Sequence, residues 1–193
     1  LQESCRRVYN QASKNKALIT YDSIGVGAGS GSNFKAMNIA KFGEGRENAK
    51  DYIEYQGFNA GSSVKNPDRY YGDPDDKIKN KDHLSNAKAQ DWWRIADMFR
   101  NTYNAVNGKP YDTDNIIAIS SDCQHLDKLK TELSTPRRDF DTSGKVKVES
   151  KKDLSARDVK SPNLADAFIM AYMNEAKTTG HSGVYVPSRK RAR

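Results

Sequence analysis

Residues 17–32 read ALITYDSIGVGAGSGS, and this stretch indicates the type of fold. It begins with apolar, β-prone residues, reaches one carboxylate at Asp22 and continues in glycine and serine. Many α/β proteins place ligand-binding groups in this way, at the carboxyl ends of strands. Apolar residues at helical spacing follow over 34–42, so the stretch predicts a strand, a loop and a helix, in the order of a βαβ unit.

The composition is that of a polar globular protein. The chain has 193 residues, enough for one domain of ordinary size with a tail, and 36% of them are hydrophobic. The net charge of +7 favours a polyanionic partner through counterion release, although a basic domain without such a partner is equally compatible with charge alone. Cys5 and Cys123 are the only cysteines, so we expect reduced thiols, and no apolar run has the length of a membrane span.

The middle of the chain alternates predicted elements with one irregular region. Residues 51–56 alternate as a strand does, and residues 64–83 are rich in aspartate and proline, which predicts a flexible excursion. Residues 86–103 predict a helix that Asn86 caps.

The last third predicts a hairpin over 140–149, a charged connector over 151–160 and a helix that Ser161 caps, with Pro162 in its first turn. The amphipathic, charged start predicts no signal peptide, and we expect residues 177–193 to form a mobile basic tail.

Asp22 and Asp166 are the strongest candidates for chemistry. Asp166 stands in the first turns of an otherwise apolar helix, where a lone carboxylate is costly to bury without a compensating cation. A hard divalent cation would supply that compensation through oxygen ligands. Two structural alternatives stay open: Asp166 as an acid that complements the helix dipole, and Asp22 as an acid that caps a loop.

The GVGAG loop and a lysine-rich strip allow further interpretations. Gly25 and Gly27 are spaced roughly as in a dinucleotide fingerprint, but Ser30 stands where the third glycine belongs, and no G-K-[ST] ending follows for a phosphate loop. A run of lysines on and after the hairpin is either a solvated face or a phosphate-contacting strip; it comprises Lys145, Lys147, Lys151 and Lys152.

Five motifs together resemble a known family. In order they are YDSIGVGAG, GFNAGSS, NAKAQDWW, KVKVESKKD and SPNLADAFIMAY, and the resemblance that they carry extends from about residue 16 to residue 172. This set resembles the nuclease domain of the large terminase subunit of tailed bacteriophages, most closely those that package by the headful mechanism. The most specific parts are D-x-x-G-x-G-A-G and E-S-K-K-D followed by S-P-N-L-A-D-A.

The resemblance implies an α/β, RNase H-like fold, with a central mixed sheet flanked by helices over residues 1–176. The family has a further acid on a first strand before the helix that leads to Asp22. Glu3 is the only acidic residue among residues 1–16, and its context is helical. We therefore expect no counterpart of this strand and its acid in this sequence.

The resemblance also implies an endonuclease that cuts concatemeric double-stranded viral DNA with little sequence preference, using two Mg²⁺ or Mn²⁺ ions. It makes Asp22, Asp166 and Lys151 catalytic. Asp22, Asp166 and Asn163 become metal ligands, although asparagine is weaker than the acid or histidine common there. Contacts to DNA would come from Gly27, Lys145, Lys147 and Lys152.

The implied partners are viral DNA, the small terminase subunit, the portal protein and the ATPase domain of the same polypeptide. That ATPase domain is not part of this sequence, because the sequence contains no Walker motif. The portal would be contacted by the tail through Arg189, Lys190, Arg191 and Arg193. We expect the protein in the host cytoplasm, transiently at the procapsid portal, and not secreted or membrane-bound. Two alternatives stay open: a nucleotide-binding module that uses GVGAG, and a non-catalytic domain that docks on the portal.

Overall fold

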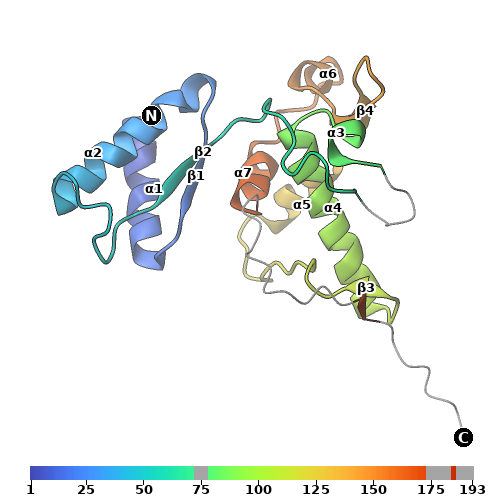
Figure 1. Ribbon diagram of the computed structural model, residues 1–193, viewed down its shortest axis with the longest axis horizontal. Coiled ribbons are helices and arrows are strands. Elements are labelled where there is room, and N and C mark those ends of the chain that lie inside the picture. The colour runs from blue at the N-terminus through green and yellow to red at the C-terminus, as the bar shows by residue number, and fades with distance from the viewer. Residues whose placement is uncertain (72–77, 173–183, 186–193) are drawn as a thin grey trace, which may run out of the picture. The chain divides into compact units, whose positions relative to one another are not determined.

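The computed structural model describes residues 1–71, 78–172 and 184–185. The chain divides into two compact units, Leu1–Ser62 and Ser63–Arg193, each of which is described by itself (Figure 1). The predicted domain span of 1–176 stays a prediction.

The first unit contains the predicted strand, loop and helix. Its strands are parallel and in register from Ile19 opposite Tyr55 to Asp22 opposite Phe58. The second strand therefore starts later than the predicted 51–56, and the glycine loop contains a 3₁₀ turn. The elements are α1 (Gln2–Asn15), β1 (Ile19–Asp22), η1 (Gly25–Gly29), α2 (Ser30–Phe42) and β2 (Tyr55–Phe58).

One buried polar side chain connects three segments of the first unit. The core consists of Cys5, Tyr9, Ala12, Ile19, Phe34 and Ile53. Asn38 of α2 is 1% exposed beside this core. Its side-chain oxygen accepts from the Tyr9 hydroxyl at 2.8 Å and from the Ile53 N–H at 3.3 Å, and its amide donates to the Ile53 carbonyl at 2.9 Å. Asn38 thus fixes α1, α2 and the segment before β2 to one another.

Replacing Asn38 with leucine is expected to destabilise the first unit by about 3 kcal/mol, because three buried polar groups lose their partner. Urea unfolding followed by circular dichroism measures the loss. Asn10→Leu, on the exposed side of α1, is the matched control and should change stability by less than about 0.5 kcal/mol. Equal effects of the two variants would contradict this role for Asn38.

Among its described residues, the second unit has more helix than strand. Asn86 caps α4 as predicted, since its side chain accepts from the Ala89 N–H at 2.9 Å. The predicted hairpin is present as β4 and β5, whereas the predicted charged connector is wrong in part because residues 151–156 are helical. The elements are α3 (Asn80–His83), α4 (Ala87–Val106), β3 (Tyr111–Asp112), α5 (Leu126–Ser134), β4 (Arg138–Phe140), β5 (Val146–Val148), α6 (Lys151–Ala156), α7 (Asn163–Tyr172) and β6 (Val184–Tyr185).

Helices α4, α5 and α7 share the main core of this unit. Its buried members are Trp92, Ile95, Met98, Ile117, Ala165 and Ile169. Leu133 of α5 packs against this cluster, so the buried face of α7 is held by both α4 and α5.

The described strands form three two-stranded sheets, of which only the β1–β2 pair is parallel. A mixed α/β fold is therefore present, and the single central sheet stays a prediction. In the parts of the chain that the structure describes, no helix combines the length and apolar character needed to cross a membrane.

Candidate metal and DNA site

Asp22 is the last residue of β1 and lies exposed at the carboxyl end of the strand. One carboxylate oxygen, Oδ1, accepts from the Ile24 N–H at 3.0 Å. The next residue, Ser23, is anchored to β2 because its N–H and its hydroxyl both donate to the Phe58 carbonyl, each at 2.9 Å. Asp22 therefore sits at a fixed strand end, with its charge on the surface.

Gly27 is required by the backbone that carries Asp22. A Cβ at position 27 would lie 2.0 Å from the Asp22 carbonyl oxygen, which is far closer than a Cβ and an oxygen can approach without a steric clash. Turn η1 therefore folds directly over the strand end, and the close approach that Gly27 permits is to this chain's own backbone. The predicted DNA contact at Gly27 stays a prediction.

Asp166 lies in the first turn of α7, with its side chain 23% exposed. Its N–H donates to the Pro162 carbonyl at 2.8 Å, and the preceding Ala165 is fully buried in the core. Two lysines approach its carboxylate: Lys88 lies 2.9 Å from Oδ1 and Lys151 lies 3.7 Å from Oδ2. The carboxylate is thus compensated by cations, as a lone acid at this place requires.

Lys88 was not predicted as part of the site. It stands in the first turn of α4, and its ammonium lies 5.3 Å from the centre of the Trp92 ring. Its side chain is only 23% exposed, against 61% for Lys151, so Lys88 is the more confined of the two cations. The sequence gives one weak indication, since positions 88 and 92 are one helical turn apart.

Lys151 is positioned by the start of α6. The Ser150 hydroxyl caps this helix by accepting from the Asp153 N–H at 3.2 Å. The buried Glu149 carboxylate accepts from Arg157 Nε at 2.8 Å, from Arg157 Nη2 at 2.7 Å and from the Arg137 N–H at 3.0 Å. The hydrogen bonds from Arg157 are the main cause of the lowered pKa of Glu149.

The Glu149–Arg157 pair predicts an acid-dependent stability. Since the pKa of Glu149 is lowered in the folded chain, its contribution is present above the ordinary value of 4.5 and is lost as the pH falls through the lowered value. We expect Glu149→Gln to be less stable than the unmodified chain near neutral pH, and this difference to shrink below about pH 4.5. Urea unfolding at several pH values measures it, and a difference that does not change with pH would refute this prediction.

The remaining predicted ligands have other partners or lie on the surface. Asn163 is exposed, and its Oδ1 accepts from the Ser161 hydroxyl at 2.9 Å. Lys147 forms an ion pair with Asp139 at 3.0 Å, which raises the pKa of Lys147. Lys145 is half-buried and Lys152 is exposed. The four basic residues proposed for portal docking, Arg189, Lys190, Arg191 and Arg193, lie outside the described residues.

The oxygen donors suit a hard divalent cation, but the described residues of neither unit supply a full set. The described ranges contain no group of three His, Cys, Asp or Glu residues that could hold a metal ion. Glu3 pairs with Arg6 and Arg7 on α1, as its predicted helical context implies. Asp22 and Asp166 belong to different units, so their closeness stays a prediction.

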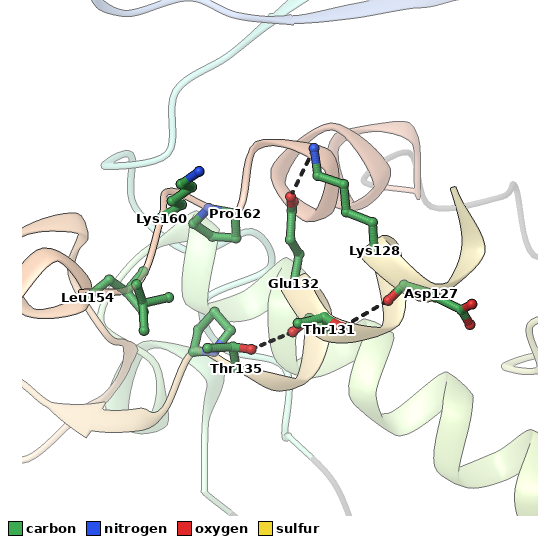
Figure 2. A pocket seen from close by; sticks show the side chains of 10 residues that line it. Asp127, Lys128, Thr131, Glu132, Thr135, Leu154, Lys160 and Pro162 are labelled. Carbon is green, nitrogen blue, oxygen red and sulfur yellow. Dashed lines mark hydrogen bonds and ion pairs between the residues drawn. The ribbon is translucent and has the colours of Figure 1, made fainter. Parts of the chain in front are cut away.

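A cavity of about 400 Å³ lies elsewhere in the second unit (Figure 2). None of the predicted site residues lines it. Its walls come from α5, α6, the segment that follows α5 and the segment that precedes α7, and consist of Asp127, Lys128, Thr131, Glu132, Thr135, Pro136, Leu154, Val159, Lys160 and Pro162.

Comparison with known proteins found no matching family model and no matching curated protein. Solved structures do match. The nuclease domain of the large terminase subunit gp2 of bacterial virus Sf6 is 26% identical, with a TM-score of 0.72, over 90% of this chain and 72% of that one. A lysine-to-alanine mutant of that domain with manganese is 25% identical, with a TM-score of 0.72, over 90% of this chain and 73% of that one. The same mutant has been solved with calcium.

These matches confirm the resemblance that the five motifs indicated: over 90% of its length this chain is similar to the nuclease domain of the large terminase subunit of a bacterial virus.

Proposed function

We propose that this chain is a metal-dependent endonuclease that cuts concatemeric double-stranded viral DNA during genome packaging, with little sequence preference. The observation that supports this most is the similarity to structures of a terminase nuclease domain, two of which contain manganese and one calcium. The exposed acid at the end of β1 and the half-buried acid of α7 add to it.

In this proposal Asp22 and Asp166 come together and supply carboxylate oxygens to Mg²⁺ or Mn²⁺, with Asn163 as a weaker third donor. Two such ions, when bound, supply an activated water and stabilise the leaving oxygen of an in-line displacement at phosphorus. Lys151 and Lys88 flank Asp166 and can place positive charge on the scissile phosphate.

Weak sequence preference follows if the protein contacts phosphates and not base edges. Lys145, Lys147 and Lys152, on β5 and around it, are the proposed phosphate contacts. For Lys147 this requires exchange of Asp139 for a phosphate oxygen, because the two side chains form an ion pair.

The wider setting belongs to the same proposal. The chain would act with an ATPase domain of the same polypeptide and with the small terminase subunit, in the host cytoplasm and at the procapsid portal. A portal-docking role of the basic tail, including Arg189 and Arg193, can coexist with cleavage. Deletion of the tail should then weaken docking and spare cleavage in solution.

The nucleotide-binding alternative has less support. It needs Gly27 to clear space for a cofactor, but a side chain there would collide first with the Asp22 backbone. A thermal shift with NAD or ATP, together with no response to Mn²⁺, would favour this alternative over the nuclease.

A plasmid assay tests the proposal. The purified chain should convert supercoiled plasmids of unrelated sequence to nicked and linear forms in Mn²⁺, and the activity should vanish in excess EDTA. Cleavage that is unaffected by EDTA, or restricted to one sequence, would contradict the proposal. An active-site variant prepared in parallel excludes a contaminating nuclease.

A further inference from the structure

The first turn of α7 has no cap from its own segment. Ser161 was predicted to cap it, but the Ser161 hydroxyl donates to the Asn163 side chain, and Pro162 has no side-chain acceptor. The first N–H groups of a helix lack partners within the helix. The N–H groups of Leu164 and Ala165 would therefore be orphaned unless another element supplied an acceptor.

Glu132 of α5 supplies that acceptor. Its Oε2 accepts from the Leu164 N–H at 2.7 Å and from the Ala165 N–H at 3.1 Å, across more than thirty positions of sequence. Its side chain is only 14% exposed, and its other oxygen, Oε1, lies 3.7 Å from Lys128. Figure 2 shows Glu132 and Lys128 projecting from the same helix at the wall of the cavity.

The two capped N–H groups immediately precede Asp166. Helix α7 is also held against α5 through Leu133, which packs on the Ala165 and Ile169 cluster. Leu133 fixes the buried face of α7, whereas Glu132 fixes its first turn. A carboxylate at a helix N-terminus also complements the helix dipole.

We infer that Glu132 is a positioning residue for the metal site: by holding the first turn of α7 it sets the direction of the Asp166 carboxylate. This inference rests on the proposed function, because it takes Asp166 as a metal ligand. Residues that orient a ligand without touching the metal commonly change metal affinity or activity by about 10- to 100-fold when they are lost.

The test compares Glu132→Ala with Glu132→Gln in the full chain. The glutamine variant keeps a side-chain oxygen that can accept both N–H groups, and the alanine variant does not. Asp127→Ala is the matched control, since Asp127 is an acid on the same helix with a fully exposed side chain. Mn²⁺ affinity is measured by calorimetry without DNA, and kcat and KM are measured on plasmid.

Glu132→Ala is expected to bind Mn²⁺ about 10-fold more weakly and to lower kcat by a similar factor with KM for DNA unchanged. Glu132→Gln and Asp127→Ala should remain within about twofold of the unmodified chain. Unchanged Mn²⁺ affinity in Glu132→Ala would overturn the inference, as would a Glu132→Gln variant as impaired as the alanine one.

Two further measurements distinguish a failure of the role inferred for Glu132 from a failure of the proposed function. Asp166→Asn should weaken Mn²⁺ binding; if it does not, the proposed function fails and not only the role of Glu132. If Glu132→Ala does not fold, hydrogen exchange of the unmodified chain decides: the Leu164 and Ala165 amides should be strongly protected. Exchange at the rate of an unfolded chain would overturn the inference.

Discussion

Asp166→Asn is expected to lower Mn²⁺-dependent plasmid cleavage by at least about 100-fold while the chain stays folded. Loss of an outer-shell partner of a metal ligand already costs about 10- to 100-fold, so loss of a ligand should cost no less. Asparagine has nearly the same shape as aspartate but is neutral. The substitution removes the negative charge from two partly exposed ion pairs, one with Lys88 and one with Lys151. Such pairs contribute little to stability, so the fold should persist.

The matched control is Asp127→Asn. It removes the same charge from an exposed position on α5, where the carboxylate lies 3.5 Å from Lys130. It should cleave like the unmodified chain, and both variants should keep the far-ultraviolet circular dichroism spectrum. Full cleavage by Asp166→Asn would remove this acid from the proposed active site.

Gly27→Ala is expected to have the second largest effect. The new Cβ would lie 2.0 Å from the Asp22 carbonyl oxygen, which is a backbone atom and cannot rotate away. Turn η1 and the end of β1 must therefore move apart, and the Asp22 carboxylate moves with them. A displacement of about 1 Å at a reacting group can cost about 100-fold in rate, so we expect Gly27→Ala to lower the rate of cleavage by about 100-fold.

Gly29→Ala is the control for this prediction. It lies in the same turn, but its Cβ would meet only the end of the flexible Leu1 side chain, at 3.2 Å. We expect cleavage within a few-fold of the unmodified chain. Comparable cleavage by both glycine variants would show that the spacing between Gly27 and Asp22 does not matter for the reaction.

The parts of this protein that the sequence predicted well depend on local chemistry. The strand that ends at Asp22, the Asn86 cap and the hairpin around β4 and β5 are each determined by residues close together in the chain. Helix α6 was missed because six residues with mixed charges carry little periodicity. The shift of β2 to Tyr55–Phe58 reflects pairing with β1, which a single strand does not reveal.

The residues of the candidate site that the sequence did not predict are brought there by contacts between distant segments. Lys88 reaches Asp166 because α4 packs against α7. Glu132 reaches the Leu164 N–H because α5 also packs against α7. Neither contact has a sequence motif. The serine that local rules favoured as a cap, Ser161, bonds instead to its neighbour Asn163. Motifs identified the acids, and packing decided which residues surround them.

The central claim is that Asp22 and Asp166 hold the same metal site. Crystals of the full chain soaked in Mn²⁺ and measured at the manganese absorption edge test it directly, because the anomalous signal distinguishes manganese from water and from lighter ions. We predict an anomalous peak within the coordination distance of hard cations, about 2.0–2.6 Å, of carboxylate oxygens from both residues. Manganese bound to neither acid, or the two carboxylates on opposite faces of the molecule, would contradict the claim.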